Sequence, residues 1–320
     1  MERLHISLLF CADASYFQHA GATIASILET NPKHEFEIFV CSEKRDYSAE
    51  QKLKVIVSQF GNATINFVEF NLPQMQGHVE SKAYISVATY LRLFMTEFLE
   101  PRVKRVLYLD CDLIVCGDLG ELWQTDLQGA WAAGVVDPVP ETFEHLDFQS
   151  GTYVNAGVLL ADLEQWRESN ILSEFLAYAS NPRFKFKNHD QDILNVVLRG
   201  KIKPLDYRWN FQSFQPDMSA KMLNISRSAF RKLRRFPSII HFTTEYKPWI
   251  YGHEPHYKKL YYKALALTPW RGWQPPDRTP RAIILKFLKL KRLKERIAWY
   301  APGLSRYLRR ALRMLTTSGS

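Results

Sequence analysis

The sequence predicts an α/β protein built on a mainly parallel β-sheet with helices on both faces. Two observations support this class: short apolar runs alternate with helical patterns, and several of those runs end on an acidic residue. Connections between parallel strands must cross over the sheet, which places helices on both of its faces. With 320 residues, of which 46% are hydrophobic, the chain can form one large domain with an appendage.

The alternation is clearest in the first third of the chain. In order, the expected elements are strand 6–11, helix 20–29, strand 36–40, helix 49–60, strand 65–70, helix 86–98 and strand 106–109. These three helices are followed by Asn31-Pro32, Gly61 and Pro101, and proline and glycine commonly end a helix. Further along we expect strands 131–136 and 154–160, helices 171–179 and 191–198, and a last strand at 238–242.

The distribution of charge separates the body from a C-terminal tail. The chain carries +9, but residues 281–320 hold eleven Lys or Arg and one Glu, which is +10 and leaves the preceding residues at about −1. We therefore expect a catalytic body at 1–268, a proline-rich linker at 269–280 and a basic amphipathic tail at 281–320. Such a tail suits an anionic membrane surface. A structural helix packed on the body is the alternative, and nucleic acid is not expected because no aromatic stacking platform accompanies the charge.

Cysteine usage and hydropathy bear on location. Cys11, Cys41, Cys111 and Cys116 show no paired metal-ligand spacing and suit a reduced compartment. No secretory signal is recognisable, and no run of about 18 apolar residues is present that would span a membrane. We expect a cytoplasmic protein, peripherally associated with the inner face of the membrane.

A pair of aspartates follows the strand expected at 106–109. Asp110 and Asp112 flank Cys111, and residues two apart on an extended or turning backbone point the same way. Facing carboxylates repel each other unless a cation neutralises them, and oxygen ligands suit Mn²⁺ or Mg²⁺ better than zinc. A bare Asp-x-Asp is more often a turn or capping pair. The position behind a buried strand favours a metal site here.

Three further polar segments are ambiguous when each is taken alone. His241 ends an apolar run, where a lone histidine is more often a satisfied core residue than a ligand. Lys247 follows six residues later and offers a compact charge suited to phosphate. Asp190 and Gln191 begin a helical pattern, where an acidic residue also stabilises a helix N-terminus.

Taken together and in order, five segments resemble the family 8 retaining glycosyltransferases, closest to bacterial lipooligosaccharide galactosyltransferases and lipopolysaccharide core glycosyltransferases. The segments are Cys-Ala-Asp-x-x-Tyr from Cys11, Leu-Tyr-Leu-Asp-Cys-Asp from Leu107, Tyr-Val-Asn-Ala-Gly-Val-Leu-Leu from Tyr153, Asp-Gln-Asp-Ile-Leu-Asn from Asp190, and His followed by Lys-Pro-Trp from His241. The resemblance spans about residues 5–275. One departure is Thr243-Thr244-Glu245-Tyr246, where the family usually has a glycine that approaches phosphate.

The resemblance implies a GT-A fold, which is a nucleotide-sugar-binding α/β sheet with an Asp-x-Asp metal site, and it implies a role for each matching residue. Asp110, Asp112 and His241 would bind Mn²⁺, or alternatively Mg²⁺. Ala12, Asp13 and Tyr16 would hold uridine, Lys247 would meet the pyrophosphate, and Arg92, Asp137, Asn155, Ala156, Asp190 and Gln191 would surround the donor sugar.

The implied reaction moves glucose or galactose from a UDP-sugar to a glycan acceptor, such as lipopolysaccharide, lipooligosaccharide or another lipid-linked or surface glycan. Gln191 is one candidate nucleophile for retention. A front-face route with Asp190 positioning hydroxyls is preferred, because an amide is a weak nucleophile. A nucleotidyltransferase is the alternative enzyme, although the expected Gly-rich loop is absent after the first strand. A non-catalytic UDP-sugar-binding module at a membrane surface is the alternative class.

Overall fold

The computed structural model describes residues 2–70, 87–149, 151–181 and 186–287. The chain divides into two compact units. The first comprises Met1–Glu245 with Pro255–Gly272, and the second comprises Tyr246–Glu254 with Trp273–Ser320. The predicted division at residues 268 and 280 stays a prediction, and most of the predicted tail, residues 288–320, lies outside the described residues.

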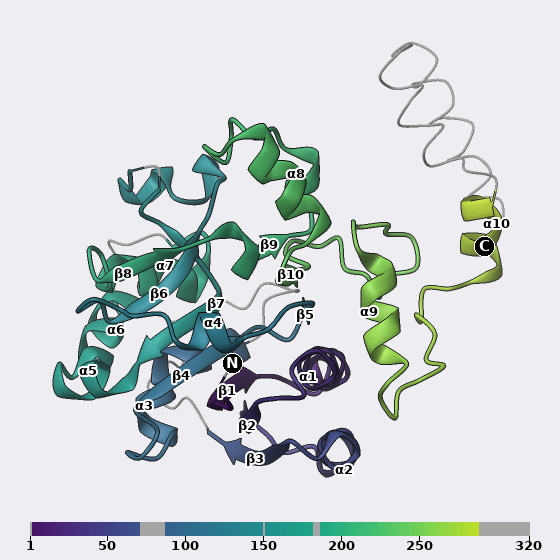
Figure 1. Ribbon diagram of the computed structural model, residues 1–320, viewed down its shortest axis with the longest axis horizontal. Helices are drawn as coiled ribbons and strands as arrows, with labels where there is room; N and C mark the ends of the chain where they lie inside the picture. Colours follow the sequence, from purple (N-terminus) through teal and green to yellow (C-terminus); the bar gives the residue numbers. More distant parts are fainter. Residues whose placement is uncertain (1, 71–86, 150, 182–185, 288–320) are drawn as a thin grey trace. The chain divides into compact units, whose positions relative to one another are not determined.

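The first unit is built on a seven-stranded sheet (Figure 1). Its strands are β1 (His5–Cys11), β2 (Glu35–Ser42), β3 (Ala63–Glu69), β4 (Arg105–Leu109), β6 (Ala132–Val136), β7 (Val154–Asp162) and β8 (Ile202–Leu205). They lie in the order β3-β2-β1-β4-β7-β6-β8. Strand β7 runs antiparallel to both of its neighbours and every other pairing is parallel, so the mainly parallel sheet is confirmed.

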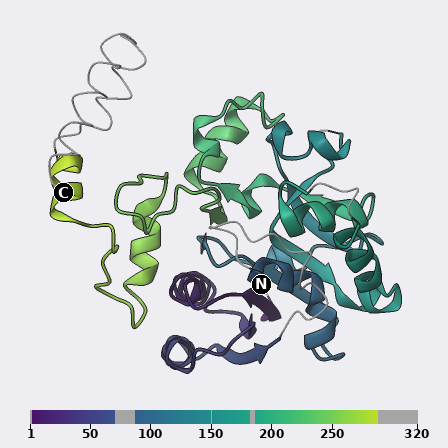
Figure 2. The same ribbon diagram turned by 180° about the vertical axis from the view of Figure 1, so that it is seen from behind.

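Both faces of this sheet are covered because its strands are apolar on both sides. Ile6, Leu8 and Phe10 of β1 join the core beneath α1 (Phe17–Thr30) and α2 (Tyr47–Phe60). Leu9 and Cys11 join the core on the opposite face. That face is covered by η2 (Val87–Phe94), α5 (Leu163–Glu168), α6 (Ile171–Ala179) and α7 (His189–Val197). Figure 2 shows the same layers from behind.

A second, three-stranded sheet contains β5 (Leu113–Val115), β9 (Phe211–Gln212) and β10 (Ile239–His241). Strand β10 lies in the middle, antiparallel to β5 and parallel to β9. Its register pairs His241 with Leu113, the residue after Asp112, and with Gln212. This pairing brings the end of β10 to the segment that follows β4.

Shorter elements complete the two units. They are α3 (Met95–Phe98), α4 (Gly120–Trp123), α8 (Arg227–Arg235), α9 (Lys258–Leu265), α10 (Pro280–Phe287), η3 (Pro140–Thr142), η4 (Glu144–Leu146), η5 (Tyr207–Trp209) and η6 (Gln215–Asp217). Among the described residues, no helix is both long enough and apolar enough to cross a membrane.

The prediction of one α-helix over residues 86–98 is wrong within the described residues. A 3₁₀ helix, η2, occupies Val87–Phe94, and only Met95–Phe98 is α-helical. Leu91, Leu93 and Phe94 are buried, and so is the charged Arg92. Because side chains on several sides of this segment are buried, tertiary packing rather than local periodicity decides its conformation.

Candidate functional site

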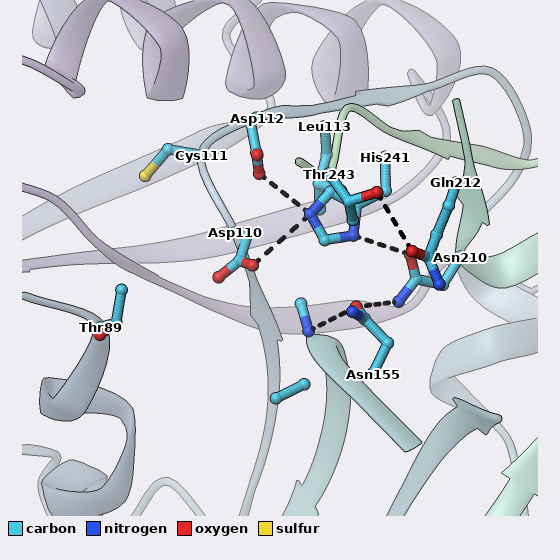
Figure 3. Close-up of polar contacts among 12 residues, drawn as sticks. Thr89, Asp110, Cys111, Asp112, Leu113, Asn155, Asn210, Gln212, His241 and Thr243 are labelled. Atoms are coloured by element: carbon cyan, nitrogen blue, oxygen red, sulfur yellow. Dashed lines mark hydrogen bonds and ion pairs between the residues drawn. The ribbon is translucent and has the colours of Figure 1, made fainter. Parts of the chain in front are cut away.

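Two carboxylates and an imidazole meet where β4 and β10 end. A carboxylate oxygen of Asp110, a carboxylate oxygen of Asp112 and a ring nitrogen of His241 all lie within 4.8 Å of one another. His241 Nε2 is 3.1 Å from Asp112 Oδ1 and 3.6 Å from Asp110 Oδ2. Figure 3 shows both carboxylates directed toward the same side of the imidazole ring. The sequence predicted these three residues as one set, and the fold brings them together.

Backbone pairing fixes this approach before any ligand is present. The Asp110 N–H donates to the Gly157 carbonyl at 2.9 Å, and the Phe242 N–H donates to the Asp112 carbonyl at 3.0 Å. The carboxylates are therefore held between β7 and β10. Thr23 Oγ1 lies 2.9 Å from the Cys111 carbonyl and 2.8 Å from the Leu113 carbonyl, so its hydroxyl secures the turn that carries Asp112.

A chain of amides orients the His241 ring. The Gly157 N–H donates to Asn155 Oδ1, which also accepts a bond from Asn210 Nδ2 at 2.8 Å. Asn210 Oδ1 then faces His241 Nδ1 at 2.9 Å (Figure 3), so Nδ1 carries the proton. Nε2 is the ring nitrogen that faces the two carboxylates. Orientation of a ligating histidine through its other nitrogen is typical of metal sites.

Asp110 is oriented by an aromatic hydroxyl and a buried cation. Tyr108 donates to Asp110 Oδ1 at 2.6 Å, and Arg92 Nη2 lies 3.1 Å from the same oxygen. This leaves Oδ2 directed toward His241. The Arg92 guanidinium also stacks on the Tyr108 ring at 4.5 Å from its centroid.

The buried side chain of Arg92 links η2, on which it lies, to β7 and α7. Its Nη1 donates to the Ala156 carbonyl of β7 at 2.8 Å, and its Nε lies 2.7 Å from Asp190 Oδ2 at the start of α7. The Nε–H is directed at the Thr89 carbonyl, so its contact with Asp190 is an ion pair rather than an aligned hydrogen bond. Burial raises the pKa of Asp190 to about 6, and the Arg92 charge opposes this rise.

The arrangement fits a divalent cation held by two oxygens and one nitrogen. The two carboxylates repel each other unless a cation lies between them, and His241 Nε2 faces the same position. Mixed carboxylate and imidazole ligands suit Mn²⁺ among hard and borderline divalent ions. Asp110, Asp112 and His241 would hold such an ion.

Gly157 is required by the close approach of β7 to this cluster. A Cβ at residue 157 would clash with His241 Cε1 and would lie only 2.7 Å from Asp110 Oδ2. Any side chain larger than the hydrogen of glycine would displace His241 or Asp110.

Gly157→Ala is therefore expected to weaken Mn²⁺ binding at least about tenfold and to lower stability by about 1–3 kcal/mol, because the methyl group overpacks the site. Titration calorimetry and thermal denaturation measure the two effects. Gly252→Ala is the matched control, since a Cβ there meets nothing within 4 Å. Wild-type affinity for Mn²⁺ in Gly157→Ala would contradict the placement of the ion.

Gln191 is held by a second hydrogen-bond chain. Its Oε1 accepts bonds from the Ala156 N–H at 3.1 Å and from Asn155 Nδ2 at 3.2 Å, while its Nε2 donates to the Tyr153 hydroxyl at 3.1 Å. Tyr153 in turn donates to Asp192 Oδ1 at 2.5 Å. Both lone pairs of the Gln191 amide oxygen are thus already engaged by N–H donors.

Asp137 and Asn155 lie beside the same network. Asp137 is buried where β6 ends, and its Oδ1 accepts a bond from the Val139 N–H at 3.1 Å. Burial raises the pKa of Asp137 to about 6, and hydrogen bonds from Val139 and Asn155 oppose the rise. The predicted sugar-side residues Arg92, Asp137, Asn155, Ala156, Asp190 and Gln191 are thus linked through contacts along β7.

The predicted uridine residues follow β1. Ala12 is buried and its N–H donates to the Cys41 carbonyl at 2.9 Å. Asp13 Oδ1 accepts bonds from the Ser15 N–H at 2.9 Å and its hydroxyl at 2.6 Å, which shapes the turn into α1. The half-buried Tyr16 directly precedes α1 as its N-cap residue, and its pKa is raised by burial and by Asp112. Lys247 belongs to the second unit, so its role beside phosphate stays a prediction.

The loop after His241 adopts a glycine-like backbone without a glycine. Thr244 has a φ of 68°, in the left-handed region that β-branched residues rarely occupy. Thr244 thus adopts a conformation that a glycine would favour, within the segment where the resemblance implies a glycine.

Sequence reasoning missed the residues that orient the cluster. Asn210 and Tyr108 act through contacts with residues distant in the chain, and neither carries a local signal of that role. Gly157 was visible within Asn155-Ala156-Gly157, but its close approach to His241 depends on the pairing of the two sheets.

A family model identifies the family, and two relatives match most of the chain. A family model described as glycosyl transferase family 8 matches residues 7–252. General stress protein A of Bacillus subtilis (strain 168) is 28% identical over 276 residues, covering 84% of this chain and 95% of that protein. Lipopolysaccharide 1,2-glucosyltransferase of Escherichia coli (strain K12) is 27% identical over 283 residues, covering 85% and 81%.

The structural comparison confirms the expected GT-A fold. The galactosyltransferase LgtC, solved with donor and acceptor sugar analogs, superposes with a TM-score of 0.73 at 24% identity, covering 83% of this chain and 99% of that one. The family model covers well over half of the chain, and the segments it matches include the Asp110, Asp112 and His241 cluster. The chain belongs to glycosyl transferase family 8.

Proposed function

We propose that this glycosyltransferase transfers glucose or galactose, with retention of configuration, from a UDP-sugar to a glycan acceptor. The observation that carries the proposal is the oriented cluster of Asp110, Asp112 and His241 at the edge of a GT-A sheet. Two similar proteins are named for transfer of glucose and of galactose, and they support both donors equally.

The donor is proposed to lie along the edge formed by β1, β4 and β7. Ala12, Asp13 and Tyr16 hold the uridine, with Tyr16 stacking on the base, and Lys247 meets the pyrophosphate. Arg92, Asp137, Asn155 and Ala156 line the sugar. Mn²⁺, or alternatively Mg²⁺, would neutralise the charge that develops on the departing UDP.

UDP is expected to bind at least about tenfold more tightly than ADP in the presence of Mn²⁺, because Tyr16 and Asp13 form a pocket suited to uracil. Base stacking on an aromatic ring contributes about 1–3 kcal/mol, so Tyr16→Ala should remove most of the affinity for UDP. Titration calorimetry with both nucleotides measures this. Equal affinities for UDP and ADP would mean that the β1 turn does not recognise the base.

Retention is proposed to follow a front-face route. The Gln191 amide oxygen already accepts two N–H bonds, so it has no free lone pair with which to attack the sugar. The departing phosphate can instead assist the acceptor hydroxyl, while Asp190, fixed by Arg92, positions sugar hydroxyls. Gln191 then orients the Asn155 and Ala156 segment rather than forming a covalent bond.

Gln191→Ala is expected to slow transfer by about 10- to 100-fold and to leave a measurable rate, since positioning is lost but no covalent intermediate is removed. Steady-state kinetics test this, with Gln51→Ala on the exposed side of α2 as the matched control. A glycosyl adduct on Gln191 or Asp190, detected by intact-protein mass spectrometry, would overturn the front-face route.

The acceptor is proposed to be lipopolysaccharide, lipooligosaccharide or another lipid-linked or surface glycan. The basic composition of residues 281–320, at +10, supports a cytoplasmic enzyme held at the inner face of an anionic membrane. High salt should weaken this attachment, because exposed charges are screened.

A further inference from the structure

A strongly basic surface surrounds α8 in the first unit. Residues 218–236 contain six cationic residues and no Asp or Glu. All six are exposed, and none forms an ion pair with a carboxylate of the described residues. We call this set the α8 surface; it comprises Lys221, Arg227, Arg231, Lys232, Arg234 and Arg235. Residues 1–280 sum to only about −1, so the concentration of charge is local.

The α8 surface is rigid because the opposite side of the helix is part of a core. Phe230 and Leu233 are buried in a cluster with Leu223 and with Phe211 of β9. Ser226 caps the helix by accepting the Ala229 N–H at 3.1 Å. At its other end, the Arg234 carbonyl accepts a bond from the Tyr257 hydroxyl at 2.7 Å. The cations are therefore presented outward from a fixed platform.

Apolar side chains and a groove accompany the charge. Met222 and Phe236 flank α8 and are 58% and 63% exposed, so two large apolar side chains lie beside the cations. A groove of about 620 Å³ is lined by Lys221, Arg227 and Arg231 together with Phe230. Cations beside exposed apolar groups match the interface of an anionic bilayer, where lipid phosphates lie next to hydrocarbon.

The α8 surface is anchored to the candidate site through one strand. Phe211 packs in the α8 core, and the next residue, Gln212, pairs in register with the metal-site residue His241. A surface bound to the α8 cations is therefore held in a fixed relation to the metal cluster. This relation suits an acceptor whose lipid end stays in the membrane.

We propose that the α8 surface docks the first unit on an anionic membrane, with lipid phosphates in the groove and Met222 and Phe236 in the interface. This membrane contact extends the proposed function. It rests on that function for one point, which is that the acceptor is linked to a lipid. It adds a membrane contact within the folded body, separate from residues 281–320. One exposed aromatic residue, Phe236, is a poor platform for stacking nucleic-acid bases, which favours lipid.

The test compares variants of the full chain by co-sedimentation with phosphatidylcholine vesicles, with and without phosphatidylglycerol. The variant Arg227→Gln/Arg231→Gln/Arg235→Gln is expected to bind the anionic vesicles at least about tenfold more weakly, since each basic side chain contributes up to about fivefold. The matched control Lys33→Gln/Lys44→Gln/Lys54→Gln removes the same charge from exposed positions elsewhere and should change binding less than about twofold.

A second variant tests the apolar contact. Met222→Ser/Phe236→Ser should weaken vesicle binding about tenfold while leaving its salt dependence unchanged, because it removes buried area but no charge. Equal losses in the α8 and control triple variants, or wild-type binding by the α8 variant, would overturn the proposal. Tighter binding to a single-stranded RNA than to anionic vesicles would also overturn it.

Hydrolysis of UDP-sugar in the absence of vesicles keeps the two proposals distinguishable. The α8 variant should retain wild-type hydrolysis, because none of its changed residues contacts the metal cluster. Absence of hydrolysis in the wild-type chain counts against the proposed function. The vesicle measurements still decide whether α8 docks on a membrane.

Discussion

Replacing Asp112 with Asn is expected to reduce sugar transfer about a thousandfold. Asp112 Oδ1 lies 3.1 Å from His241 Nε2, and its charge is one of two negative charges available to the ion. A bound metal contributes several kcal/mol of charge stabilisation in the transition state, and about 4 kcal/mol corresponds to a factor of a thousand in rate. Because Asn is nearly the same size as Asp, the fold should be preserved.

The measurement is turnover with Mn²⁺ at increasing concentration, together with circular dichroism to verify folding. Asp126→Asn is the matched control, since Asp126 is exposed and its side chain caps only a local turn. Full turnover by Asp112→Asn, or wild-type turnover in excess EDTA, would remove Asp112 from the metal site.

Arg92→Met is expected to cost about 3–5 kcal/mol in the free energy of unfolding, the amount typical when one partner of a buried ion pair is removed. Arg92 is 4% exposed and contacts the carboxylates of Asp110 and Asp190. Methionine fills a similar volume but leaves Asp190 buried without its cation. The same change should misplace Asp110, so metal affinity falls as well.

The loss of stability should depend on pH. Burial already raises the pKa of Asp190 to about 6, and Arg92 opposes that rise, so without Arg92 the pKa is higher. A neutral carboxyl is less costly to bury. The stability difference between Arg92→Met and the wild type should therefore be largest near pH 8 and shrink toward pH 5.

Denaturant unfolding at both pH values measures this, with Arg3→Met as the matched control. The Arg3–Glu35 pair is exposed, and such pairs contribute about 0–1 kcal/mol. A loss below about 1 kcal/mol in Arg92→Met would show that Arg92 does not hold the site together.

The sheet could be predicted because its strands are apolar on both faces and separated by helical patterns. Each strand from β1 to β4 was found in this way, since alternate residues such as Leu8 and Leu9 of β1 enter opposite cores. The three-stranded sheet was not recognised as a sheet. Strands β5 and β9 have only three and two residues, too short to leave a periodic pattern, and they exist because β10 pairs with both.

Without the family resemblance, the clearest signal of the candidate site was charge that follows a buried strand. Asp110 and Asp112 follow a buried strand, and the family pattern added His241. The orientation of the His241 ring comes from Asn210 and Asn155, which lie on different elements and meet only in the folded chain. The same holds for Arg92, whose clamp role depends on the approach of α7 and β7 to η2.

The measurement that tests the central claim most directly is hydrolysis of a panel of nucleotide sugars by the full chain, with and without Mn²⁺. Release of UDP from UDP-glucose or UDP-galactose, dependent on Mn²⁺ and abolished in Asp112→Asn, is the result expected of a metal-dependent hexosyltransferase. Hydrolysis that is indifferent to Mn²⁺, or that persists in Asp112→Asn, would contradict the proposed role of the Asp110, Asp112 and His241 cluster.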